Sequence, residues 1–475
     1  MIHVNGRLMV DAVSQNSPMS DHNDPLKVRK TALDILNRVD QGNRTLDNIL
    51  EEILETEPFP AKRDRSLLQA LVFGVLRWRG RLDYVISSFS RTPFSRIDPP
   101  IRNVLRLGLF QILYLSRIPP SAAVNTAVEL AKASSPPWVA RFVNGVLRNA
   151  ARDHAKVNFP DIEREPVSAI SACKSFPNWL IRRWVKAVGL DETLARCNAI
   201  NRIPALTLRT NTLKTDRGHL LQTLAGEAAT ARPCDIAPDG IALSNLRKRI
   251  PEIDAFNAGW FQVQDEAAQL VSLLTGPRSG EKVLDACAGL GGKTGHMAQL
   301  MENIGPITAL DINPAKLKRL ERQMHRLGVS CVHTRTHDLN RPPGKNKFGH
   351  FDRVLLDAPC TGLGVLRRNP DAKWKTRESM IYSASEKQVR LLCNLAHLVK
   401  PGGHLVYAVC STEPEENETV VDRFLQTHSE FIKANPSERL PQAVASLLGP
   451  DGSLKTSPDK HNMDGFYCVG LKRIQ

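Results

Sequence analysis

Two cysteines stand where a predicted parallel sheet would place reactive groups. Cys360 follows the apolar run 352–357 within Asp-Ala-Pro-Cys-Thr-Gly, and Cys410 ends the run 404–410 within Tyr-Ala-Val-Cys-Ser-Thr. A thiolate in such a place can add to an electron-poor ring, and a nearby acid can assist by hydrogen bonding to the ring or protonating it. A free cysteine is usually a small buried core residue, so these two are singled out by their place at strand ends.

The other cysteines carry no comparable signal. The chain has nine, an odd number, and no pair has Cys-x-x-Cys spacing, which disfavours a disulfide framework and a metal site. We therefore expect reduced thiols, no metal and a cytoplasmic location. For catalysis, Cys287, Cys331, Cys393 and Cys468 are interpreted as core residues.

Acidic residues lie at or near the ends of four predicted strands. The strands are residues 283–287, 307–311, 329–336 and 352–357, and their acids are Asp285, Asp311, Asp338 and Asp357. Parallel strands bind ligands at their carboxyl ends, so four acids there predict a ligand crevice. Asp311 lies about 20 residues after a glycine loop, a spacing that suits hydrogen bonding to ribose hydroxyls.

The glycine loop joins the first of these strands to a helix that begins near Lys293. Its sequence, Ala288-Gly289-Leu290-Gly291-Gly292-Lys293-Thr294, lets a ligand approach the backbone. The dehydrogenase fingerprint Gly-x-Gly-x-x-Gly fails because Thr294 replaces its third glycine. A phosphate-binding loop fails because Cys287 stands where its first glycine belongs.

The elements that would position these residues fall into three regions after a polar tail at residues 1–24. Residues 25–155 show helical periodicity throughout and predict an all-α bundle of five to seven helices. Residues 156–277 mix short strands with helices and predict a small α+β module. Residues 278–475 alternate strands and helices, with helices starting near Lys293, Pro314, Ser385 and Glu415, and predict a doubly wound α/β domain with a mostly parallel sheet.

Composition supports a multidomain globular protein with a polyanionic partner. The 475 residues carry 64 Lys+Arg against 49 Asp+Glu, a net charge of +15, and the excess is spread over all three regions. No apolar run approaches the ~20 residues that span a bilayer, so we expect no membrane association.

Two basic stretches are candidate RNA-contact surfaces. The first comprises Arg77, Arg79 and Arg81, which flank Trp78 on a predicted helix, and Lys62, Arg63 and Arg65 at the preceding helix start; it predicts either a solvated face or phosphate contacts. The second stretch follows the Cys360 motif and favours RNA contact beside the active site. Its members are Arg367, Arg368, Lys373, Trp374, Lys375 and Arg377.

Taken together, these motifs resemble the RNA 5-methylcytosine methyltransferases that use S-adenosylmethionine. The resemblance rests on Asp-Ala-Cys-Ala-Gly-Leu-Gly-Gly-Lys-Thr, on both cysteine motifs, on Pro-Glu-Glu-Asn-Glu at 414–418 and on Gln-Val-Gln-Asp-Glu-Ala-Ala at 262–268. The helical region resembles the NusB-like RNA-binding fold. The combination is similar to the bacterial Sun/Fmu-type enzymes that act on small-subunit (16S) ribosomal RNA, which implies a Rossmann-like methyltransferase domain.

The resemblance implies a role for each candidate residue. Cys410 is the implied nucleophile toward carbon-6 of a cytosine, Cys360 assists release of the covalent adduct, and Asp357 lies between cofactor and base, hydrogen-bonding or protonating the ring. Asp311 is implied at the ribose, Asp338 at the adenine, and Lys293 at the target base or the donor carboxylate. The implied cofactor loop comprises Cys287, Ala288, Gly289, Leu290, Gly291, Gly292 and Lys293.

The sequence departs from the family pattern at two places. Gly289-Leu290 replaces the usual Ala-Pro, so we expect a less preorganised loop that still binds the donor. Tyr-Ala-Val-Cys-Ser replaces the usual Tyr-Ser-Thr-Cys-Ser, which removes two hydroxyls beside Cys410.

Three other interpretations stay open beside ribosomal RNA methylation by a monomer. The substrate could be transfer RNA, which the NusB-like region disfavours. The chain could be a non-catalytic RNA-binding factor, which the retained cysteines and Asp357 disfavour. It could also be an NAD-dependent dehydrogenase, which the glycine spacing disfavours.

Overall fold

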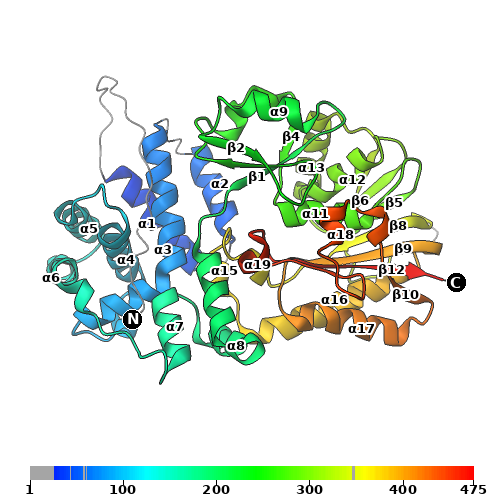
Figure 1. Ribbon diagram of the computed structural model, residues 1–475. Coiled ribbons are helices and arrows are strands. Elements are labelled where there is room, and N and C mark those ends of the chain that lie inside the picture. Colours follow the sequence, from blue (N-terminus) through cyan, green and yellow to red (C-terminus); the bar gives the residue numbers. More distant parts are fainter. Residues whose placement is uncertain (1–25, 43, 57–58, 60, 345–347, 475) are drawn as a thin grey trace. The chain divides into compact units, whose positions relative to one another are not determined.

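The computed structural model describes residues 26–42, 44–56, 59, 61–344 and 348–474, which fall into two compact units (Figure 1). The helical unit comprises Met1–Asn201 together with the short segment Asn369–Lys375, and the sheet unit comprises Arg202–Arg368 and Thr376–Gln475. The expected polar tail at residues 1–24 lies outside the described residues. In the part of the chain that is described, no helix combines the length and apolar character that crossing a membrane requires.

The helical unit confirms the predicted all-α bundle. Prolines begin several of its helices, where a missing N–H costs nothing and the fixed φ favours the first turn. Its core is a continuous cluster of aliphatic side chains that includes Ile35, Leu71, Val104 and Leu147. The helices are α1 (Lys27–Asp40), α2 (Leu46–Thr56), α3 (Lys62–Phe89), α4 (Pro99–Tyr114), α5 (Pro120–Ser134), α6 (Pro137–Asp153), α7 (Pro166–Lys174), α8 (Asn178–Asn201) and α15 (Ala372–Lys375).

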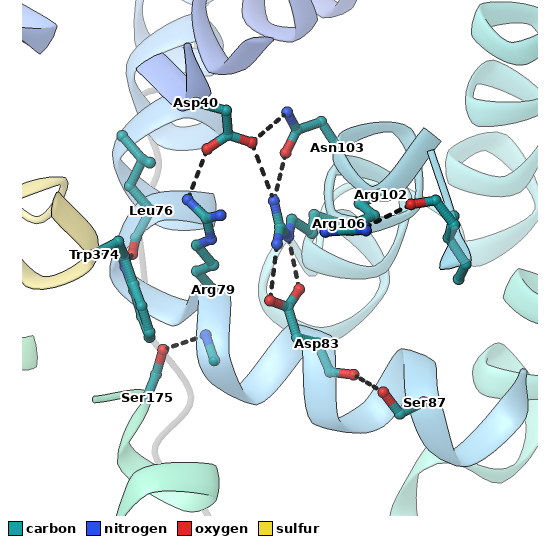
Figure 2. Close-up of polar contacts among 12 residues, drawn as sticks. Asp40, Leu76, Arg79, Asp83, Ser87, Arg102, Asn103, Arg106, Ser175 and Trp374 are labelled. Atoms are coloured by element: carbon teal, nitrogen blue, oxygen red, sulfur yellow. Dashed lines mark hydrogen bonds and ion pairs between the residues drawn. The ribbon is translucent and has the colours of Figure 1, made fainter. Parts of the chain in front are cut away.

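The arginines flanking Trp78 do not form a solvated or RNA-contacting face. Arg77 is 5% exposed, and burial lowers its pKa to about 10. Arg79 donates to Asp40 Oδ1 at 2.7 Å (Figure 2). Arg81 donates to the Cys173 carbonyl. A solvated or phosphate-contacting face is therefore wrong for Arg77, which is buried, while Arg79 and Arg81 are half-buried and bonded within the helical unit.

Arg106 of α4 is the centre of the polar cluster in Figure 2. Its guanidinium is buried and donates to both oxygens of Asp83, at 2.6 and 2.8 Å, and to Asn103 Oδ1. Asp40, the partner of Arg79, lies within ion-pair distance of the same guanidinium. The cluster ties α1, α3 and α4 together, because a bidentate carboxylate holds a guanidinium in one orientation.

The basic stretch after the Cys360 motif is also internal. Lys373 is fully buried, and its ammonium donates to the carbonyls of Arg77 and Ser175 and to Asn201 Oδ1. Trp374 donates its indole N–H to the Leu76 carbonyl at 2.7 Å (Figure 2). These side chains fix Asn369–Lys375 inside the helical unit, so the predicted RNA contact is wrong for both.

The remaining basic residues of that stretch divide similarly. Arg367 is 4% exposed, and Arg367 and Arg368 each donate to Asp464 within the sheet unit. Lys375 donates to the Arg44 carbonyl. Arg377 is exposed. Local sequence patterns do not indicate this burial, because the matching acceptors lie far away along the chain.

The first part of the sheet unit is a four-stranded antiparallel sheet with the order β2-β3-β1-β4. It confirms the predicted α+β module, although β2 was not predicted because its residues are mostly exposed and show no alternation. Asp216 caps α9 by accepting from the His219 N–H. The elements are β1 (Leu206–Thr210), α9 (Arg217–Leu224), β2 (Thr230–Pro233), β3 (Gly240–Ser244), α10 (Asp254–Asn257) and β4 (Phe261–Val263).

The second part is an eight-stranded mixed sheet, which confirms the doubly wound methyltransferase-type domain. Five strands are parallel in the order β9-β8-β5-β6-β7, and β12 and β10 extend the sheet antiparallel beyond β9. The strands are β5 (Val283–Asp285), β6 (Ile307–Asp311), β7 (Val332–Thr336), β8 (Phe351–Asp357), β9 (Val399–Val409), β10 (Phe431–Ala434), β11 (Leu454–Lys455) and β12 (Tyr467–Arg473).

Helices cover this sheet, and the loops that join them to the strands form the site. Helix α16 begins at Glu378, two turns before the Ser385 start expected from the sequence. The longer helices are α11 (Glu266–Thr275), α12 (Gly292–Leu300), α13 (Pro314–Leu327), α16 (Glu378–Ala396) and α17 (Glu418–Thr427), and the short ones are α18 (Gln442–Ala445) and α19 (Pro458–His461). Short 3₁₀ turns are η1 (Phe94–Arg96), η2 (His154–Lys156), η3 (Ile250–Glu252), η4 (Leu363–Val365), η5 (Pro414–Glu416) and η6 (Ser437–Arg439).

Candidate functional site

The predicted site residues gather at the carboxyl edge of the parallel strands. Asp285, Asp311 and Asp357 are the last residues of β5, β6 and β8, and Cys410 directly follows β9. Strand register places Asp285 beside Leu355 and Asp357 beside Ala408, so neighbouring strands end at nearly the same level. This common edge results from parallel pairing, and it brings together residues that are far apart in sequence.

The two thiols are in direct contact. Cys360 Sγ and Cys410 Sγ lie 3.2 Å apart, and both residues are half-buried. The hydrogen bond with Cys410, burial and the nearby negative charges raise the pKa of Cys360 well above its ordinary value. Cys360 therefore holds its proton. The pair suits one nucleophile and one proton-bearing partner.

An ion pair lies next to the thiols. Lys293 Nζ and Asp357 Oδ2 are 2.5 Å apart. Burial opposes the charge of Lys293, but the attraction of Asp357, its hydrogen bond and the nearby Cys410 outweigh burial and raise the Lys293 pKa. The ammonium also lies 5.3 Å from the centre of the Phe466 ring. A cation is thus fixed at the edge of the sheet where the two thiols lie.

The glycine loop is held in shape by backbone bonds to the next strand. Gly289 and Gly291 have positive φ angles of 57° and 84°, and Gly291 forms the N-cap of α12. The Ala288 N–H donates to the Leu310 carbonyl at 2.8 Å, and the Gly289 N–H donates to Asp311 Oδ2 at 3.1 Å. The expected loss of stiffness at Gly289-Leu290 is thus countered by a direct tie to β6. Leu290 is 46% exposed, and Cys287 packs against core side chains.

Asp311 and Asp338 both support local backbone. Asp311 is nearly buried and accepts from the N–H groups of Gly289 and Asn313. Asp338 is half-buried, follows β7, and accepts from the N–H and the side-chain amide of Asn340. A carboxylate has about four acceptor sites, so each of them retains capacity for a ligand hydroxyl or amino group.

Asp285 differs from the other strand-end acids. It is 1% exposed, its Oδ2 accepts from Thr294 Oγ1 at 2.7 Å, and burial raises its pKa to about 7. The side chain connects β5 to the first turns of α12. The structure therefore places it beneath the glycine loop.

Two residues that support the site were not predicted from the sequence, Arg209 and Asn211, whose side chains bind backbone carbonyls. Arg209 of β1 is buried and donates to the Gly292 carbonyl at 2.7 Å. Asn211 donates to the carbonyls of Gly259 and Leu327, both at 2.8 Å. Their pattern Leu-Arg-Thr-Asn was interpreted only as a strand end. An arginine inside an otherwise apolar strand was the available signal.

A second missed contact lies behind the Cys410 loop. The Gly364 N–H donates to the Cys410 carbonyl at 3.0 Å, and the Gly465 N–H donates to the Gly364 carbonyl at 2.8 Å. A Cβ on Gly364 would meet the Gly465 carbonyl oxygen at 1.9 Å, so only glycine fits there. The backbone after Cys360 is therefore packed tightly against the backbone at Cys410.

Comparison with known families assigns a type to each part of the chain. Residues 272–472 match the model described as 16S rRNA methyltransferase RsmB/F. Residues 26–152 match the NusB family, and residues 176–248 match the ferredoxin-like domain of RsmF/B-like methyltransferases.

Comparison with individual proteins agrees. The chain is 36% identical over 447 residues to the "probable ribosomal RNA small subunit methyltransferase B" of Bacillus subtilis, covering 94% of this chain and 98% of that protein. It is 34% identical to ribosomal RNA small subunit methyltransferase B of Pseudomonas syringae, covering 87% and 90%. The crystal structure of PH0851 superposes with a TM-score of 0.80 at 27% identity, covering 96% of this chain and 100% of that one.

Proposed function

The chain belongs to the RsmB/F family of 16S rRNA methyltransferases, and on this premise we propose that it transfers a methyl group from S-adenosylmethionine to carbon-5 of a cytosine in small-subunit ribosomal RNA. The observation that supports the cytosine chemistry most is the contact of two thiols at 3.2 Å beside the Lys293–Asp357 pair. Carbon-5 of cytosine is a poor nucleophile until a group adds to carbon-6, and a thiolate is suited to that addition.

The glycine loop fits the methyl donor. A Cβ built on Gly289 would meet no atom within 4 Å, so space is open where a ligand would approach the backbone. The N-terminus of α12 favours the donor's carboxylate, and Asp311 offers acceptor sites for ribose hydroxyls. Asp338 is proposed at the adenine. Bound there, S-adenosylmethionine supplies an electrophilic methyl group.

Cys410 acts first in the proposed sequence. Its thiolate adds to carbon-6, forming a carbon–sulfur bond and moving the electron pair of the ring double bond to carbon-5. Carbon-5 then takes the methyl group, as the bond between that methyl and the donor's sulfur breaks and the donor leaves as a neutral thioether. Loss of the carbon-5 proton to a base re-forms the double bond as the carbon–sulfur bond breaks, which returns Cys410 as a thiolate. Cys360, which keeps its proton at rest, is proposed to assist this release.

Lys293 and Asp357 are proposed to hold the base during the addition. In their ion pair the proton lies on Lys293, so Asp357 offers an acceptor for the cytosine amino group while Lys293 offers a proton for the ring nitrogen. Removing electron density from the ring makes carbon-6 more electrophilic. This assignment keeps a hydrogen-bonding role for Asp357 and gives the protonating role, which the resemblance had left open for Asp357, to Lys293.

The function is tested with labelled methyl donor and purified RNAs. We expect label to enter 16S ribosomal RNA and not transfer RNA, with bisulfite sequencing placing it on one cytosine. Cys410→Ala is expected to abolish transfer, while an alanine at the buried Cys468, which the mechanism does not use, retains it. Label in transfer RNA alone, or on an atom other than carbon-5, would contradict the proposal.

A further inference from the structure

Glu416 connects the two cysteine loops through one buried carboxylate. It is the last residue of η5 and is 0% exposed. Ser411 Oγ donates to its Oε2 at 2.6 Å, and the Thr361 N–H donates to its Oε1 at 2.9 Å. Thr361 Oγ1 also donates to Oε2. Ser411 directly follows Cys410 and Thr361 directly follows Cys360, so the same side chain binds the neighbour of each thiol.

Further contacts fix Glu416 and the Cys360 loop to the scaffold. Gln388 of α16 donates to Glu416 Oε1 at 3.0 Å and to the Pro359 carbonyl at 3.1 Å. Tyr407 of β9 donates its hydroxyl to the Glu416 carbonyl at 2.6 Å. Glu416 is therefore held at both ends: Tyr407 of β9 binds its backbone carbonyl, and the Gln388 amide of α16 binds its carboxylate.

The bonding pattern shows a charged group held by neutral donors. Four hydrogen bonds point at the two oxygens, which matches the acceptor capacity of an ionised carboxylate. None of the described residues forms an ion pair with it. A buried charge without a cation is costly to stability unless fully hydrogen-bonded, and an apolar side chain would fill the same volume at lower cost. Its benefit is the geometry that it imposes on both loops.

We propose that Glu416 is a positioning residue that sets the separation of the Cys360 and Cys410 thiols. It acts through Thr361 and Ser411 and touches no reacting atom. The role of Glu416 in holding the two loops together follows from the hydrogen bonds alone. The effect of that role on catalysis rests on the proposed function. A separation of the two loops would move the proton of Cys360 away from the sulfur that must leave the base.

The first test measures the distance between the thiols without any methylation assay. Dibromobimane becomes fluorescent when both of its arms are displaced by neighbouring thiols, and Cys410→Ala gives the background. We expect rapid cross-linking in the unaltered protein and a lower rate in Glu416→Gln. In Glu416→Ala we expect a rate at least about tenfold lower than in the unaltered protein. Gln keeps the length and one acceptor oxygen, so it should rescue in part. The matched control is Glu281→Gln, which removes a carboxylate bound to Arg353 at the opposite end of β5.

The second test separates positioning from donor binding. Glu416→Ala should lower kcat by on the order of 10- to 100-fold and leave the KM for S-adenosylmethionine unchanged. If Glu416→Ala fails to fold, Ser411→Ala and Thr361→Val, which each remove a single hydroxyl bond, must both slow cross-linking. Cross-linking of a folded Glu416→Ala, or of both single-bond variants, at the unaltered rate overturns the proposal. Absence of methylation in the unaltered protein with cross-linking as expected would instead overturn the proposed function.

Discussion

At the scale of single residues, the site depends on where protons are held. Cys360 keeps its proton because Cys410, burial and nearby charge disfavour its thiolate. Lys293 keeps its own because of Asp357, although burial opposes it. One neutral thiol and one fixed cation therefore lie near Cys410, the sulfur that we propose as the nucleophile. The cysteine motifs identified Cys360 and Cys410, and the glycine loop identified Lys293. Which of these groups holds a proton could be inferred only from their contacts in the structure.

Asp285 leads to a prediction about pH and stability. Its folded pKa of about 7 lies above the ordinary value of an aspartate, so between about pH 4 and 7 the folded chain keeps a proton that the unfolded chain has lost. The free energy of unfolding should fall as pH rises through this window and stay lower above it. Asp285→Asn should flatten this fall, measured by urea denaturation at about pH 5 and about pH 8. Equal losses in both proteins would show that Asp285 does not carry the effect.

At the scale of elements, the strand ends and loops were predictable and their supports were not. The five parallel strands and the glycine loop followed from apolar runs ending in acidic residues. Strands β2, β10 and β11 were missed because they are two to four residues long and show no clear alternation. The basic segment after the Cys360 motif was misinterpreted, because Lys373 and Trp374 find their acceptors on α3, α7 and α8. Local patterns contain no information on such distant partners.

Two of the three glycines in the loop, Gly289 and Gly291, can be compared as a matched pair at this scale. Both have positive φ, which disfavours alanine by about 1 kcal/mol. A Cβ on Gly289 would meet open space, whereas one on Gly291 would meet Leu320 Cγ at 2.6 Å. We expect Gly291→Ala to lower the midpoint of thermal unfolding and the affinity for S-adenosylmethionine more than Gly289→Ala. Equal effects of the two substitutions in calorimetry and in donor titration would contradict this account of the loop.

At the scale of the whole molecule, the net charge of +15 favours RNA binding only through basic side chains that are exposed. Arg77, Arg79 and Arg81 of α3 are poorly placed to supply it, because Arg77 is buried and the other two donate within the helical unit. Helix α6 exposes Arg141 and Arg148, which lie two turns apart and therefore share one face. The overall charge was readable from the sequence, but the arginines that remain available depend on which others the fold buries.

Helix α6 therefore yields a prediction about RNA binding. The double variant Arg141→Gln with Arg148→Gln should weaken binding to 16S ribosomal RNA, and the slope of log affinity against log salt should fall by about 1 to 2. Arg152→Gln on the same helix is the control, since Arg152 already pairs with Asp153 at 2.7 Å and should change the slope less. Filter binding across a salt series measures both. An unchanged slope in the double variant would exclude this face from the interface.

The most direct test of the central claim is to trap the covalent intermediate. Cys360→Ala is incubated with 16S ribosomal RNA and S-adenosylmethionine, denatured, digested and analysed by mass spectrometry. The proposed mechanism predicts an adduct that survives denaturation, in which a methylated cytosine is joined to the peptide that contains Cys410. No adduct with Cys360→Ala, or an adduct attached to any other cysteine, would contradict the assignment of Cys410 as the nucleophile and Cys360 as the residue that assists release.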